Sequence, residues 1–236
     1  MKTGISMTLI VFCIAGCGML ETRPTKISKT YSPPSEKISF FGDNEKVGAP
    51  AFIAGQQWTY RRIDHWKKRE VERFRQELFF PDEKLWIVRW SILNSDKADR
   101  MGSVTGELFN PLNHSFADAS MSGAYEPLHF PLTKGKSWSF DYSIPSKNLR
   151  VSQTATVRGW EQVTVPAGKF RAIRITHEGY YSAKEAVGDY SWTGQISETY
   201  WYAPEIKRVV KREYQDTKGD GLIWDQWRDE LVDMKL

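Results

Sequence analysis

The chain has 236 residues, of which 40% are hydrophobic and 14% aromatic. This composition excludes a wholly disordered chain and fits one large all-β domain or two small ones. The 33 basic and 29 acidic residues leave a net charge of +4, and the two signs are interspersed. Nucleic-acid-binding proteins usually carry a clustered basic face, so the composition does not indicate a nucleic-acid partner.

The N-terminus has the pattern of a secretion signal that ends in a lipid-modification site. Lys2 precedes the apolar run 9–14, which is too short for a transmembrane helix because a bilayer core takes about 20 residues. The stretch Ile14-Ala15-Gly16-Cys17 resembles the lipobox of bacterial lipoproteins, in which the cysteine thiol takes a diacylglyceryl group. We therefore expect residues 1–16 to be a signal peptide and Cys17 to be the lipid-bearing residue.

Acylation of Cys17, for example with palmitate, would attach the protein to a membrane. Each buried methylene contributes about 0.8 kcal/mol, so more than one acyl chain gives lasting attachment. Enterobacterial lipoproteins kept in the inner membrane usually have Asp after the cysteine, whereas this chain has Gly18, and this resemblance favours the periplasmic face of the outer membrane. With Cys13 in the signal peptide and Cys17 acylated, we expect no disulfide and no cysteine-based site in the mature domain.

Two further regions follow the signal peptide. Residues 17–50 are polar and contain Pro33-Pro34, which is typical of a flexible tether. Residues 51–236 are predicted to form a single β domain, because the dominant period of hydrophobicity is two. The clearest run is 137–144, in which apolar and polar residues alternate. Such alternation is typical of antiparallel strands with one buried and one solvated face.

The same period predicts about ten strands separated by turn residues. They are expected at 57–63, 71–79, 86–92, 103–109, 137–144, 150–158, 162–165, 170–177, 191–202, 208–215 and 227–234. Near the C-terminus, Trp224, Trp227 and Leu231 would also share a helical face, but Val232 and Met234 continue the alternation and favour a strand. Sequential hairpins of this number predict an all-β fold, a strongly curved antiparallel sheet that forms a closed or half-closed barrel.

Two segments of the domain resemble a group of bacterial exported domains. The hairpin 163–175 contains the residues VPAGKF, and the segment 199–211 contains YWYAP and ends in VVK. TapB-like proteins commonly show a V-P-A-G-x-F hairpin and a later Y-W-Y-A-P strand that ends in V-x-K. The resemblance covers residues 130–214, although the family usually has Gly where this chain has Ile206 or Lys207. It implies a β fold and no particular activity.

Residues that commonly carry catalysis form no complete motif. The histidines have no metal-ligand spacing; they are His65, His114, His129 and His177. The stretch 120–123 lacks the first glycine of G-x-S-x-G. The segment 216–221 resembles a calcium loop but has Lys218 where a ligand is needed, and a tight turn explains it more simply. We therefore expect no enzymatic activity, no cofactor and no metal.

The ten tryptophans divide into two predicted groups. Trp66, Trp160, Trp192 and Trp224 lie among polar residues and are candidate ligand-contact aromatics, because exposed aromatic rings bind sugars, peptides or acyl chains. The other group lies on apolar strand faces. The residues expected to face inwards and fill a packed core are Trp86, Val88, Trp90, Ile92, Trp138, Phe140, Tyr142 and Ile144.

These observations favour a non-catalytic lipoprotein module that contacts the membrane through the lipid on Cys17 and binds or positions another envelope component, such as a protein. Two alternatives stay open. A curved sheet can enclose a groove for a lipid or another apolar ligand. A cell-wall enzyme would need two carboxylates close together in space. Distance along the sequence does not show whether the fold brings such a pair together from the candidates Glu161, Glu178, Glu185 and Asp189.

Overall fold

The computed structural model describes residues 45–82, 85–110, 115–117, 122–123, 125–145, 148–184 and 191–236. The predicted signal peptide, Cys17 and most of the predicted tether lie outside these residues, as do His114, Glu185 and Asp189. No helix in the described part is long and apolar enough to cross a membrane.

Twelve strands and one short 3-10 helix make up the secondary structure of the described residues. The strands are β1 (Gln57–Asp64), β2 (Arg69–Asp82), β3 (Leu85–Ser95), β4 (Val104–Asn110), β5 (Ser115–Ala117), β6 (Ser122–Gly123), β7 (Ser137–Ile144), β8 (Leu149–Val165), β9 (Gly168–Lys184), β10 (Ser191–Ala203), β11 (Arg208–Lys218) and β12 (Ile223–Lys235). The helix is η2 (Pro204–Ile206).

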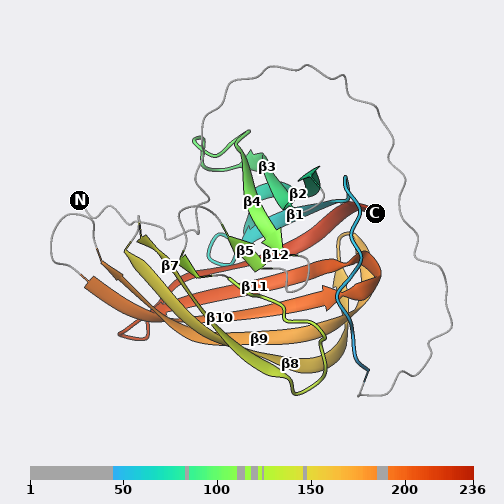
Figure 1. Cartoon of the computed structure of the whole chain (residues 1–236). Helices are drawn as coiled ribbons and strands as arrows, with labels where there is room; N and C mark the ends of the chain where they lie inside the picture. The colour runs from blue at the N-terminus through green and yellow to red at the C-terminus, as the bar shows by residue number, and fades with distance from the viewer. Residues whose placement is uncertain are drawn as a thin grey trace.

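All the strands belong to one antiparallel sheet of order β5-β4-β3-β2-β1-β12-β11-β10-β9-β8-β7-β6. The first strand β1 pairs with the last strand β12, so two meanders meet in the middle of the sheet (Figure 1). The all-β antiparallel prediction is therefore confirmed. Among the described residues the hydrogen bonds do not close the sheet, whose ends are β5 and β6, and closure into a barrel stays a prediction.

The local pattern explains most strand boundaries. β7 coincides with the alternating run 137–144, and its side chains from Phe140 to Ile144 are buried at every second position. The two strands predicted at 150–158 and 162–165 are one continuous strand, β8, with a register shift between Val157 and Gly159. Gly159 has φ +134°, a conformation that L-residues with a side chain rarely adopt. A bulge therefore replaces the expected break.

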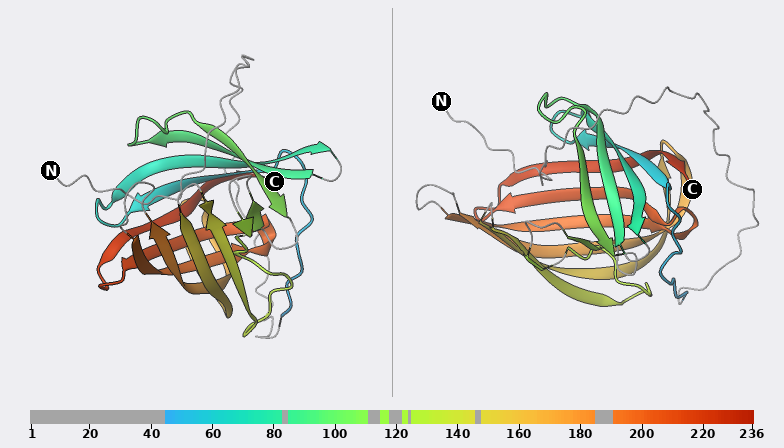
Figure 2. Two further views of the ribbon diagram at one scale, coloured as in Figure 1. Left: turned by 60° about the vertical axis from the view of Figure 1, so that its left-hand side comes forward. Right: turned by 45° about the horizontal axis from the view of Figure 1, so that its top comes forward.

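The sheet bends so that β1–β4 cross the layer formed by β8–β11 (Figure 2). Two apolar clusters fill its inner face. The first lies on β7–β10 under residues 125–132, here called the covering segment, of which Leu128 and Leu132 are fully buried. The second joins β1–β4 to the ends of β8–β12, around the fully buried Trp58 and Leu231. The core is therefore divided between two packing regions of one sheet.

Five of the eight residues that were predicted to face inwards are buried. They are Val88, Ile92, Phe140, Tyr142 and Ile144. Trp86, Trp90 and Trp138 are half-buried and pack against the edges of the clusters. Residues at the end of the predicted tether also contact the domain, because Val47 bridges to Leu132.

Candidate functional site

A row of buried charges crosses the inner face between the two apolar clusters. It runs over five neighbouring strands, β2-β1-β12-β11-β10, with alternating sign: Glu72, Arg62, Asp229, Arg212 and Glu198. Arg62 stands opposite both Glu72 and Asp229 in the register, and Asp229 stands opposite Arg212. We call these five residues the charged belt.

The belt residues pair with one another, and Glu72 also pairs with Arg100 at 3.1 Å. Arg62 donates two hydrogen bonds to Asp229, with Nε–Oδ1 of 2.8 Å and Nη2–Oδ2 of 2.9 Å, and Arg212 donates to Glu198. Burial lowers the pKa of Arg212, but the carboxylates of Glu198 and Asp229 outweigh burial and raise it above its usual value. A buried charge is tolerated only when it is paired. The belt is therefore a structural ion-pair network.

His177 stands next to the belt and holds the covering segment. Its side chain is completely buried, and its Nε2 lies 2.9 Å from the carbonyl oxygen of Pro127. The ring packs edge-on against Tyr200, with centroids 4.6 Å apart. Burial lowers the pKa of His177 to about 4, so the imidazole is neutral at neutral pH and its N–H can donate to Pro127.

The hollow between the two clusters is small. It measures about 80 Å³ and is lined mainly by aromatic side chains and two guanidinium groups, among them Tyr60, Tyr125, Tyr200, Arg208 and Arg212. Ligand pockets typically measure about 300–1,000 Å³. The middle of the described interior therefore has no room for an acyl chain.

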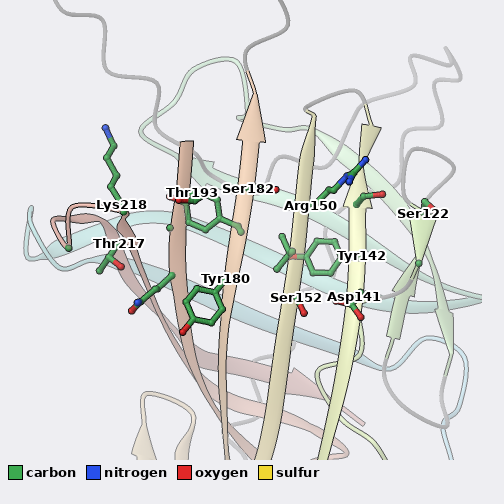
Figure 3. A pocket seen from close by; sticks show the side chains of 18 residues that line it. Ser122, Asp141, Tyr142, Arg150, Ser152, Tyr180, Ser182, Thr193, Thr217 and Lys218 are labelled. Atoms are coloured by element: carbon green, nitrogen blue, oxygen red, sulfur yellow. The ribbon is translucent and has the colours of Figure 1, made fainter. Parts of the chain in front are cut away.

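A much larger hollow lies on the opposite, solvated face of the sheet, over β6–β11 (Figure 3). It measures about 980 Å³. Its exposed side chains alternate with the buried Tyr142, Val151 and Tyr181, so they share the outer face. They are Asp141, Arg150, Ser152, Tyr180, Ser182, Thr193 and Gln195, joined by the half-buried Ser143, Thr217 and Lys218 at the sides. We call this hollow the outer groove.

The exposed side chains of the outer groove are mostly polar, and the buried apolar residues Tyr142, Val151 and Tyr181 also line it. Serine and threonine hydroxyls, one amide and one exposed tyrosine ring line it, with the cations Arg150 and Lys218 against the single anion Asp141. Gly194 is required in its floor, because a Cβ there would lie 2.1 Å from the carbonyl oxygen of Thr217 and 2.5 Å from the ring of Tyr181. Such a surface can bind a polar ligand by hydrogen bonds.

The four tryptophans proposed as ligand contacts are not brought together. Trp66 is 61% exposed in the β1–β2 turn, and Trp224 is 38% exposed at the start of β12. Trp224 reaches the rim of the outer groove, because the ammonium of Lys218 lies 3.6 Å from its ring centroid. Trp192 packs against the first core cluster, and Trp160 does so beneath the guanidinium of Arg171, 3.7 Å away.

The carboxylates proposed for an enzyme are also apart where they are described. Glu161 lies opposite Ala172 of β9, so Glu178 is six residues further along, about 20 Å at roughly 3.3 Å per residue. Glu161 is paired with Arg174 at 3.1 Å. The part of the chain that the structure describes contains no group of three or more His, Cys, Asp or Glu side chains that could hold a metal ion.

Sequence reasoning missed the belt and the outer groove for different reasons. Glu198 stands between Ile196 and Tyr200 on the apolar face of β10, so strand parity alone could have marked it as an inward-facing charge. The groove residues are serines and threonines on the solvated face, where such residues are expected in any sheet. Only the three-dimensional curvature distinguishes them.

Comparison with protein-family models and with curated proteins gave no match. Among the solved structures that resemble the chain, a Bacteroides fragilis protein assigned as exported, with a YmcC-like fold, is 15% identical with a TM-score of 0.49, over 81% of this chain and 100% of that chain. A Parabacteroides distasonis protein assigned as a lipoprotein is 12% identical with a TM-score of 0.46, over 81% and 100%. The hypothetical lipoprotein YmcC of Escherichia coli is 12% identical with a TM-score of 0.33, over 77% and 85%.

Proposed function

We propose that the chain is a lipoprotein of the bacterial cell envelope, held by acyl chains on Cys17, whose β domain is a non-catalytic module that binds another envelope component at the outer groove. The lipobox-like stretch before Gly18 supports the anchor and the outer membrane as its destination. The location of the hollow space supports the binding mode, and this is the observation that carries the proposal. The interior between the clusters leaves about 80 Å³, whereas the outer groove offers about 980 Å³.

The polar side chains exposed in the groove favour a polar partner over the apolar-ligand alternative. An acyl chain gains from leaving water only when apolar surface receives it. The exposed side chains of the groove are mostly hydroxyls and charged groups, and the apolar inner face is filled by the covering segment, with Leu128 fully buried in it. Stoichiometric uptake of a fluorescent fatty acid by the full chain would instead favour the carrier.

Site-directed cross-linking in intact cells tests the binding mode. We would place p-benzoylphenylalanine at Ser182 in the groove and, as a matched control, at Thr164, an exposed residue near the other end of β8. A discrete adduct from position 182 and none from position 164 is the expected result. Equal labelling at both positions, or none at either, would contradict the proposal.

The anchor is tested separately with two substitutions. Cys17→Ser should leave an uncleaved precursor and abolish labelling with radioactive palmitate. Gly18→Asp should keep the label but move the protein towards the inner-membrane fraction. Labelling that persists in Cys17→Ser would overturn the lipoprotein proposal, whatever the groove binds.

A further inference from the structure

Three hairpin turns lie side by side at one end of the sheet. The strand order β4-β3-β2-β1-β12-β11 places the β3–β4, β1–β2 and β11–β12 turns next to one another. Contacts join them: Lys67 Nζ lies 2.7 Å from Asp96 Oδ2, and the amide of His65 donates to the carbonyl of Gln226 at 3.0 Å. The three turns therefore form one continuous edge of the molecule.

Each of these turns exposes large apolar side chains. Met101 is 57% exposed, Trp66 is 61% exposed and Leu222 is 66% exposed, and Leu222 is followed directly by the exposed residues Ile223 and Trp224. A run of three exposed apolar residues is unfavourable in water unless something covers it. We call these five residues the hairpin row.

Basic groups accompany the row. Lys67, Lys68 and Arg69 follow Trp66 directly, against the single anion Asp64 in that turn, and Lys67 and Arg69 share the carboxylate of Asp96. The other two turns are close to neutral. At the β11–β12 turn, the ammonium of Lys218 lies 3.6 Å from the ring centroid of Trp224. The excess of positive charge is thus confined to the β1–β2 turn beside Trp66, whereas Asp220 and Asp225 accompany Lys218 near Trp224.

We propose that the hairpin row is a docking surface for an anionic lipid bilayer. Tryptophan rings are favoured at the level of the lipid headgroups, leucine and isoleucine at the acyl boundary, and lysine or arginine against lipid phosphates. Separate turns, each carrying its own apolar tip, can enter an interface of this kind without a matching surface on a partner. The charge of the β1–β2 turn selects a bilayer of negative surface potential.

The proposed acyl anchor would make this contact effective, and in that respect the inference rests on the proposed function. The 27 residues between Cys17 and Glu45 reach at most about 90 Å, so the anchor keeps the domain near a bilayer. Once the anchor is in the bilayer, the contact between the hairpin row and the same bilayer becomes intramolecular. Its occupancy then rises because the effective concentration of the bilayer near the row is high. The row itself needs no lipid on Cys17, so its affinity can be measured without the anchor.

Vesicle sedimentation of residues 17–236 carrying Cys17→Ser, which lack the apolar signal segment, tests the docking surface. The vesicles contain about three parts phosphatidylethanolamine to one part phosphatidylglycerol, the anionic lipid. We expect this protein to sediment with them, and the combination Trp66→Ser, Leu222→Ser and Ile223→Ser to bind at least about tenfold more weakly. The matched control is Ile53→Ser with Leu236→Ser, which removes exposed apolar residues beyond the opposite ends of β1 and β12 and should bind like its parent.

Three results would overturn the proposal. They are no sedimentation of the parent protein, equal losses in the row and control variants, and equal binding to neutral phosphatidylcholine vesicles. The first of these, combined with a stable complex with a purified envelope protein that the row variant loses, would assign the row to a protein partner. Since no acyl chain is present, none of these results bears on the proposed lipidation of Cys17.

Discussion

The charged belt and the hairpin row depart from the usual distribution of residues in opposite directions. The belt places five charged side chains on the inner face of the sheet, with side-chain exposures from 3% for Glu198 to 18% for Arg212. The row places large apolar side chains in solvent, with Leu222 66% exposed. Burying charge and exposing apolar surface both cost free energy.

The difference lies in how each region is compensated. In the belt, the register sets opposite charges face to face, so Arg62 meets Glu72 and Asp229 without any long-range adjustment. The cost of burial is offset within the fold, and the belt stabilises one pairing of the two meanders. The row exposes its apolar area in turns and at the first two residues of β12. We infer that the belt serves the structure and the row serves an external contact.

The largest effect is expected from breaking the belt at its centre. Arg62→Met leaves Asp229 without its hydrogen-bonded guanidinium, whereas Glu72 keeps Arg100 at 3.1 Å. Removing one partner of a buried pair costs about 3–5 kcal/mol. Urea unfolding followed by circular dichroism measures this loss. Arg150→Met, which removes an exposed arginine from the outer groove, should change stability by less than about 0.5 kcal/mol. A belt variant as stable as this control would show that the pairs are not needed for the fold.

The second effect is a pH dependence at the edge of the belt. The pKa of His177 is about 4 in the folded protein because burial lowers it, against about 6.5 in an unfolded chain. The contribution of the neutral ring to the free energy of unfolding is therefore complete above pH 6.5 and is lost as pH falls towards 4. The loss corresponds to about 3 kcal/mol.

The measurement compares wild type with His177→Gln, which keeps a donor for Pro127. Asp216 titrates in the opposite sense, because burial raises its pKa to about 6 and its contribution falls as pH rises from 3.8 to 6. The stability difference between the two proteins removes that background. It should shrink by about 3 kcal/mol between pH 7 and pH 4. A constant difference would show that His177 is not the group responsible.

A smaller effect is expected where the covering segment meets the half-buried Trp138. Its indole Nε1 donates to the carbonyl of Glu126 at 3.0 Å, and its ring packs against the first core cluster. A fully buried tryptophan costs about 3–5 kcal/mol when truncated to alanine, so we expect about 2 kcal/mol for Trp138→Ala. The fully buried Trp58 is the internal reference, and Trp58→Ala should cost more. Equal losses, measured by urea unfolding, would contradict this ranking.

Local pattern was sufficient to predict β7, because its apolar residues alternate without interruption between Ser137 and Ile144. It was ambiguous for β12, because Trp224, Trp227 and Leu231 satisfy a helical and an extended spacing at once. Pairing with β1 and β11 makes that segment a strand. The sequence contains no local signal for those pairings, because β1 and β12 lie at opposite ends of the chain.

The tryptophans show the same limit at the level of single residues. Trp66 and Trp224 are exposed because turns or strand ends carry them beyond their neighbours. Trp160 has polar neighbours in sequence too, yet Arg171 of the adjacent strand β9 covers its ring. Exposure depends on side chains from paired strands, and the sequence around a tryptophan does not contain them.

The smallest effect on stability is expected in the hairpin row, where it sharpens the distinction from the belt. Substituting Trp66, Leu222 and Ile223 together by serine removes side chains that are at least 40% exposed. The free energy of unfolding, measured with urea, should therefore change by no more than about 0.5 kcal/mol per site. Vesicle binding should fall in the same variant. A loss of several kcal/mol would mean that the row packs within the fold, and the contrast with the belt would then disappear. A row variant of unchanged stability and reduced vesicle binding would show that the row serves an external contact. The belt variant Arg62→Met should instead lose stability whether or not vesicles are present.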